Sequence, residues 1–125
     1  MSERIDVLSA GELADGQMVE VEAEGHKLLL ARVGDAVYAS DAHCPHLHGN
    51  LTKGTLAGTI VTCPLHGSQF DLRDGSVVRW TKWHGAAKSM AEFTRHPRPL
   101  RVYEVAVEGG RVRVDPQKEP PAAQR

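Results

Sequence analysis

Residues 44–49 read CPHLHG and residues 63–68 read CPLHGS, and these two stretches decide how the rest of the chain is interpreted. They present the spacings Cys-x-His and Cys-x-x-His, with sixteen residues between the two motifs. A structural zinc site usually has a different order, in which two closely spaced cysteines precede two closely spaced histidines. Two loops that each contribute one cysteine and one histidine are instead suited to an inorganic cofactor larger than a single ion, with each loop binding one end of it. A two-iron, two-sulfide cluster of the mixed type takes two thiolates on one iron and two histidines on the other.

Together, the two motifs resemble the signature of the Rieske [2Fe-2S] proteins. The resemblance implies that Cys44 and Cys63 bind one iron through sulfur, and that His46 and His66 bind the other through a ring nitrogen. It also implies one Rieske-type cluster per chain as both cofactor and metal site. The alternative from another class is a zinc-stapled binding module, which would contain no sulfide.

The ligand set also bears on the reduction potential. Two thiolates, two neutral imidazoles, two ferric ions and two sulfides sum to zero charge, so reduction adds only one negative charge. Histidine ligation therefore raises the potential to about −150 to +300 mV, from about −400 mV in the all-cysteine plant type. High-potential Rieske proteins add a disulfide between the ligand loops and hydroxyl donors from a serine and a tyrosine. Here Gly49 and Leu65 resemble the disulfide positions, Ser68 matches the serine and Phe70 replaces the tyrosine, so we expect the lower half of the range.

Outside the motifs, apolar and polar residues alternate in short runs, which predicts an all-β, antiparallel fold. Turn residues such as Gly34-Asp35 and Gly109-Gly110 separate the runs. The predicted strands are 18–23, 27–33, 36–40, 59–62, 100–107 and 111–114. The family resemblance implies a β-sandwich base with a small cluster-binding subdomain of two ligand loops.

One segment departs from the strand pattern: residues 85–95 have helical spacing between a glycine and two prolines, which predicts a short helix in an insertion. We expect residues 1–114 to form a single Rieske domain and the proline-rich residues 115–125 to be a flexible tail. The run 96–100 (HPRPL) resembles the proline loop that covers the cluster in this family; a plain helix stop before an edge strand is the alternative.

Length and composition limit the remaining possibilities. A chain of 125 residues suits one domain, and 41% hydrophobic residues provide a core. A formal net charge of −1 argues against a nucleic-acid partner. The apolar runs are too short to span a membrane, and the acidic start lacks the pattern of a secretion signal. Two cysteines are too few for a disulfide framework, so we expect a cytoplasmic location with reduced thiols.

The charge is unevenly distributed along the chain. Residues 1–60 hold four Lys/Arg and nine Asp/Glu, whereas residues 61–125 hold eleven and seven. The basic half could steer an acidic partner, although a solvated face is the commoner explanation. His43 and His48 lie beside the motifs and are interpreted as loop residues rather than ligands.

No second constellation of residues indicates catalysis, and the chain has no glycine-rich dinucleotide loop. The resemblance therefore implies a soluble ferredoxin, not an enzyme, that carries single electrons. Its partners would be a flavin-dependent ferredoxin reductase and the terminal oxygenase of an aromatic-ring dioxygenase or related hydroxylase. The alternative within electron transfer is the small Rieske-like subunit of an assimilatory nitrite reductase. The final substrate is not encoded in a carrier, because a carrier does not touch it.

Overall fold

The strands in the described part of this chain form two antiparallel sheets. The computed structural model describes residues 5–45, 49–64, 67–79 and 99–115. Every strand pairing within this part of the chain is antiparallel, as predicted. The strands are β1 (Ile5–Ser9), β2 (Met18–Ala23), β3 (His26–Val33), β4 (Ala36–Asp41), β5 (Thr55–Ala57), β6 (Ile60–Thr62), β7 (Gln69–Asp71), β8 (Val77–Arg79), β9 (Val102–Glu108) and β10 (Arg111–Asp115). The described segments also contain two short 3-10 helices, η1 (Ala10–Glu12) and η2 (Leu51–Lys53).

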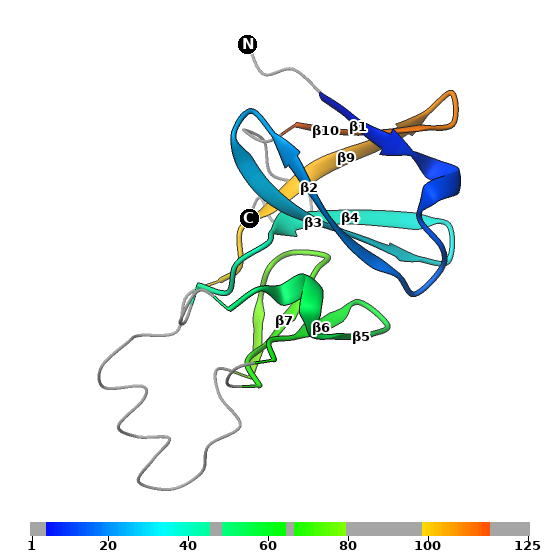
Figure 1. The fold of residues 1–125 in the computed structure, drawn as a ribbon. Coiled ribbons are helices and arrows are strands. Elements are labelled where there is room, and N and C mark those ends of the chain that lie inside the picture. The colour runs from blue at the N-terminus through cyan, green and yellow to red at the C-terminus, as the bar shows by residue number, and fades with distance from the viewer. Residues whose placement is uncertain (1–4, 46–48, 65–66, 80–98, 116–125) are drawn as a thin grey trace, which may run out of the picture.

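The larger sheet has six strands in the order β1-β10-β9-β4-β3-β2. Its two end strands, β1 and β2, come into contact, so the sheet curls around an apolar core. That core contains Leu8 from β1, Leu28 and Leu30 from β3, and Val112 from β10. The smaller sheet has the order β5-β6-β7-β8 and lies below the six-stranded sheet in Figure 1.

Strand β3 connects the two layers because it is buried on both faces. Successive side chains of a strand point to opposite faces. Leu28 and Leu30 therefore enter the core of the larger sheet, while Leu29 and Ala31 enter a second core that lies against the smaller sheet. The continuous apolar run of β3 is thus explained by burial on both sides rather than on one.

The strands expected from alternation are confirmed with small shifts at their ends. The hairpin β2–β3 turns at Glu24 and Gly25, and the hairpin β9–β10 turns at two glycines with positive φ. The expected tail boundary is wrong by one residue, because Asp115 belongs to β10 and is buried. Residues 116–125 and the predicted helix near 85–95 lie outside the described residues.

Four strands were not predicted: β1, β5, β7 and β8. Three of them have only three residues each, which is too short for alternation to be recognised. No helix in the described segments is long and apolar enough to cross a membrane.

Candidate metal centre

The first motif begins directly after β4 and closes into a short loop. His43 forms an antiparallel bridge with Asn50. The backbone N–H of Cys44 donates to the carbonyl oxygen of Gly49 at 2.8 Å, and the N–H of Leu51 donates to Ala42 at 2.8 Å. These bonds fix the base of the loop on both sides of residues 46–48, which lie outside the described residues. Cys44 is therefore held by the backbone of its own loop.

The second motif follows β6 and is fixed in a similar way. The N–H of Cys63 donates to the carbonyl oxygen of Ser68 at 2.8 Å, and the N–H of Gly67 donates back to Cys63 at 3.1 Å. The guanidinium Nε of Arg79, on the neighbouring strand β8, donates to the carbonyl oxygen of Gly67 at 3.0 Å. Strands β6, β7 and β8 thus all contribute to holding this loop.

Both cysteines are buried in the same core, with exposed fractions of 0% for Cys44 and 2% for Cys63, and both are free of disulfides. They share this core with Leu51, Phe70 and Leu100, among other apolar residues. Two reduced thiols from separate loops, enclosed by apolar side chains, are the donor set that one iron of a mixed two-iron cluster requires. This part of the predicted site fits the expected cofactor.

The two predicted histidine ligands, His46 and His66, lie outside the described residues, so their assignment stays a prediction. His43 and the two cysteines lie in the described part of the chain, where no group of three or more metal-binding side chains is found. Of the residues expected to tune the cluster, Gly49, Ser68 and Phe70 are all buried. Leu65 lies outside the described residues.

Only the end of the predicted proline loop is described. Pro99 is exposed, whereas Leu100 is buried in the core that contains both cysteines. The N–H of Leu100 donates to the carbonyl oxygen of Gly75 at 2.8 Å. Gly75 has a φ of +79°, and a Cβ atom there would lie 2.0 Å from the Leu100 carbonyl oxygen. Sequence reasoning missed this contact, although Asp74-Gly75 carries a recognisable turn signal.

Two polar contacts brace the elements that carry the loops. The carboxylate of Asp71, at the end of β7, accepts hydrogen bonds from the Arg73 side chain, the shortest at 2.6 Å. This hydrogen bonding holds the pKa of Asp71 below its usual value, against the opposing effect of burial.

At the end of β4, Asp41 accepts a hydrogen bond from the Tyr103 hydroxyl on β9. Burial and this bond to Asp41 raise the pKa of Tyr103. The pairing of Tyr103 with Asp41 has no signal in the sequence, because its partners are 62 residues apart.

Comparison with known proteins places this arrangement in a family. The model of the Rieske [2Fe-2S] domain matches residues 3–104. The ferredoxin component of the naphthalene 1,2-dioxygenase system of Pseudomonas aeruginosa is 31% identical over 111 residues, covering 89% of this chain and 93% of the relative.

Solved structures agree. The ferredoxin of carbazole 1,9a-dioxygenase from Nocardioides aromaticivorans IC177 superimposes with a TM-score of 0.76 at 26% identity, covering 91% of this chain and 98% of that one. A chain from the complex of reduced oxygenase and oxidized ferredoxin in carbazole 1,9a-dioxygenase has a TM-score of 0.74 at 30% identity, covering 94% and 96%. These findings favour a Rieske-type iron–sulfur cluster over the single zinc ion considered as the alternative. The chain belongs to the Rieske [2Fe-2S] family.

Proposed function

We propose that this chain is a one-electron carrier that takes electrons from a flavin-dependent ferredoxin reductase and delivers them to a terminal oxygenase. The observation that carries the proposal is the match to a relative named as a ferredoxin component of a dioxygenase system, which extends over 93% of that relative. The similarity to a chain in an oxygenase–ferredoxin complex supports the oxygenase as acceptor. The reductase is inferred because a carrier that delivers electrons must also receive them.

We further propose that Cys44, His46, Cys63 and His66 bind the cluster. When bound, a Rieske cluster accepts and returns one electron, at a potential raised by its two neutral histidine ligands. The chain contributes burial and rigidity. Cys44 and Cys63 lie in an apolar core, and the backbone bonds to Gly49 and Ser68 fix their loops, so little structure has to rearrange when the charge changes. A cytoplasmic location is proposed with this role, because two cysteines are too few for the disulfide framework of a small secreted domain.

The ligand assignment is tested by replacing each of the four residues with alanine. We expect each variant to lose bound iron and acid-labile sulfide together with the Rieske EPR signal of the reduced protein. The matched controls are His43→Ala and His48→Ala, which change histidines of the same stretch and should retain the signal. A control that loses the cluster, or a ligand variant with the native signal, would require a different set of ligands.

The carrier role is tested by reconstitution. A flavin-dependent reductase, a terminal aromatic-ring oxygenase with its aromatic substrate, NADH, O2 and the loaded protein should together give hydroxylated product, and omission of this protein should abolish it. The parallel assay uses the large subunit of an assimilatory nitrite reductase. Stimulation of nitrite reduction, without any transfer to an oxygenase, would favour the alternative role as a reductase subunit.

A further inference from the structure

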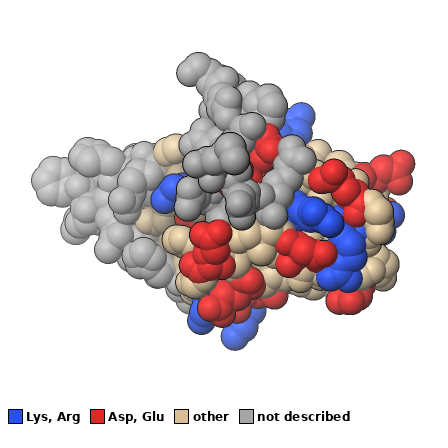
Figure 2. All heavy atoms as spheres, turned by 90° about the horizontal axis from the view of Figure 1, so that it is seen from above, with Lys and Arg blue, Asp and Glu red and all other residues tan. Residues whose placement is uncertain are grey.

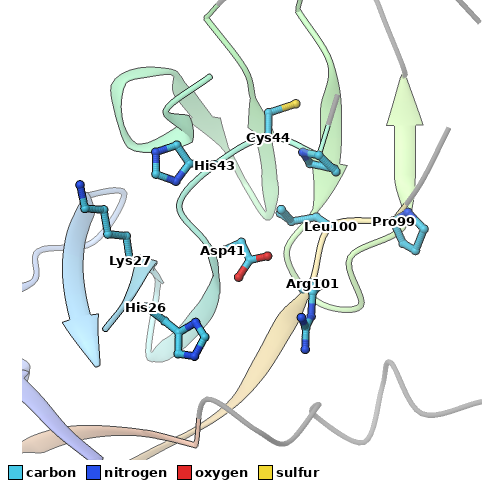
Figure 3. Close-up of a pocket in the computed structure, with 9 residues that line it drawn as sticks. His26, Lys27, Asp41, His43, Cys44, Pro99, Leu100 and Arg101 are labelled. Carbon is cyan, nitrogen blue, oxygen red and sulfur yellow. The ribbon is translucent and has the colours of Figure 1, made fainter. Parts of the chain in front are cut away.

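A cavity of about 360 Å³ opens beside the first ligand loop. Its wall is formed by residues far apart in the sequence, and includes Cys44 itself. Figure 3 shows the charged and titratable side chains that line it, from the start of β3, the end of β4, the loop before Cys44 and the segment before β9. These are His26, Lys27, Asp41, His43 and Arg101. We call this cavity the Cys44 pocket.

The Cys44 pocket carries two permanent positive charges at its mouth. Lys27 and Arg101 are both exposed, and no ion pair within 4.0 Å involves either of them in the described part of the chain. The guanidinium of Arg101 lies 6.0 Å from the ring centroid of Tyr103. Asp41 is the acidic residue among the lining residues, and its carboxylate already accepts the Tyr103 hydroxyl. Two cations that form no ion pair with another described residue, beside one carboxylate that is already hydrogen-bonded, make this pocket a site for an anionic group.

We propose that the Cys44 pocket is a docking site for an Asp or Glu side chain on the surface of a protein electron-transfer partner. The inference rests on the proposed carrier function and adds the chemistry of partner recognition. Charge complementarity supports it, because Lys27 and Arg101 bring two positive charges to the lining against the one carboxylate of Asp41, so that an acidic side chain can pair with either cation. Location supports it as well, because Cys44 forms part of the pocket wall, so that a partner seated there lies next to a proposed cluster ligand.

Such a contact would act mainly on association rather than on the electron-transfer step. Complementary charges steer encounter and raise the association rate, and salt weakens the effect. Surface pairs of this kind contribute little to the stability of the carrier itself. The pocket residues are therefore expected to affect the rate of complex formation and its salt dependence, while the cluster and its potential stay the same.

The test compares two double variants that remove the same charge. Lys27→Gln with Arg101→Gln neutralises the pocket; the matched control, Lys53→Gln with Arg113→Gln, removes one charge from η2 and one from β10, away from the pocket. Glutamine is used because Lys27 lies directly opposite Glu22 in the sheet, where a new glutamate would create repulsion between the strands. A third variant, Lys27→Arg with Arg101→Lys, keeps both charges. Unfolding midpoints and the EPR signal confirm that each variant is folded and loaded.

The measurement is the stopped-flow rate of electron transfer from the reduced protein to the terminal oxygenase, at low and high ionic strength. At about 20 mM salt we expect the pocket variant to be about ten-fold slower than wild type, and the control and charge-retaining variants to change by less than about two-fold. At about 0.5 M salt the difference should fall below about two-fold, because the Debye length is then only a few ångströms. Equal slowing by the pocket and control variants, or no slowing by either, would overturn the proposal.

Small inorganic oxidants show whether the anion that the Cys44 pocket attracts is a free ion or an acidic side chain of a protein partner. Ferricyanide is a free anion, and tris(phenanthroline)cobalt(III) is a cation of the same charge magnitude. If neutralising the pocket slows ferricyanide but not the oxygenase, the pocket attracts free anions only, and the docking proposal is wrong. If wild-type protein neither accepts electrons from the reductase nor reduces the oxygenase, the carrier function fails and the docking proposal with it. Normal transfer by wild type that is unaffected in the pocket variant refutes the docking proposal alone.

Discussion

Gly75 is constrained in two ways in the cluster-binding region, by its backbone conformation and by a close neighbour. It combines a φ of +79° with a close approach to the Leu100 carbonyl oxygen, which a Cβ atom would reach at 2.0 Å. Gly16 has nearly the same φ, +80°, but a Cβ atom at Gly16 would have nothing within 4 Å. Substitution of each glycine by alanine therefore distinguishes the free-energy cost of the left-handed conformation from that of the clash.

We predict that Gly16→Ala lowers the free energy of unfolding by about 1 kcal/mol, the usual cost of a left-handed conformation. Gly75→Ala should lower it by about 3 kcal/mol or more, since backbone must also move. Denaturant unfolding of the loaded protein measures both. Equal losses would show that the approach of Leu100 to Gly75 makes no contribution.

Phe70 is the residue where a single oxygen atom should change the redox behaviour. It is fully buried in the core that contains Cys44 and Cys63. A hydroxyl group that donates to the cluster or its ligands stabilises the more negative, reduced state. We predict that Phe70→Tyr raises the reduction potential by tens of millivolts, on the order expected for one added donor. Protein-film voltammetry gives the value.

Phe70→Leu is the control for this change, because it alters packing without adding a donor. Ser68→Ala should move the potential in the opposite direction, as it removes a buried hydroxyl next to the second ligand loop. A Phe70→Tyr potential at or below that of the wild type would rule out the predicted role of this position.

At the scale of elements, the turn after β7 depends on the ion pair between Asp71 and Arg73. Because the pKa of Asp71 is lowered in the folded protein, its charged form stabilises the fold above the unfolded pKa, and this contribution is lost as the pH falls through the lower folded pKa. We predict that Asp71→Asn costs about 1 kcal/mol at pH 7. The difference from wild type should shrink below pH 3.8, the ordinary value for this group.

Urea unfolding across this pH range tests the prediction. The control is Glu22→Gln, which removes a negative charge from an exposed position on β2. A cost for Asp71→Asn that stays constant down to acidic pH would show that the turn depends on the shape of the side chain rather than on its charge.

The elements also show which parts of this fold can be read from the sequence. Strands β2, β9 and β10 alternate over five or more residues, β3 is a continuous apolar run, and glycine-containing turns join β2 to β3, β3 to β4 and β9 to β10, so local pattern predicts these strands. The short strands β5, β7 and β8 are held by their neighbours in the smaller sheet, and a pattern of three residues does not distinguish a strand from a loop. Pairing between distant elements is the part that local reasoning cannot supply.

In the candidate site, too, local sequence predicts some features, and contacts between distant segments account for the others. The spacing of the motifs led to Cys44 and Cys63, and the structure brings both into one buried core. The bonds between Leu100 and Gly75 and between Tyr103 and Asp41 join segments that are distant in the chain, and no spacing rule predicts them. The role of His46 and His66 remains a prediction from the sequence.

At the scale of the molecule, the net charges of the two halves of the sequence do not describe how charge is distributed over the folded protein. The expected basic excess of the second half includes Lys82, Lys88, Arg95 and Arg98, which lie outside the described residues. From above the six-stranded sheet, Figure 2 shows Asp and Glu side chains next to Lys and Arg side chains. The ion pair between Asp6 and Arg111, at 2.7 Å, joins charges from the two sequence halves, and the Cys44 pocket is a local feature that neither half predicts.

We propose that residues up to Asp115 form one cooperative unit, because one core contains Leu29 and Ala31 of the larger sheet together with Val61 and Phe70 of the smaller one. Loss of strand signal in far-ultraviolet circular dichroism and loss of cluster absorbance should then share one thermal midpoint. Deletion of residues 116–125 should leave that midpoint unchanged. Two separate transitions, or a large loss of stability on deletion, would contradict a single domain with these limits.

The most direct test of the central claim is a reductive titration of the anaerobically purified protein, followed by EPR. We predict that one electron per chain converts an EPR-silent protein into one with a full Rieske-type signal, with two irons and two sulfides bound per chain. A protein that binds a single zinc ion and gives no signal, or whose signal is that of an all-cysteine cluster, would contradict the account.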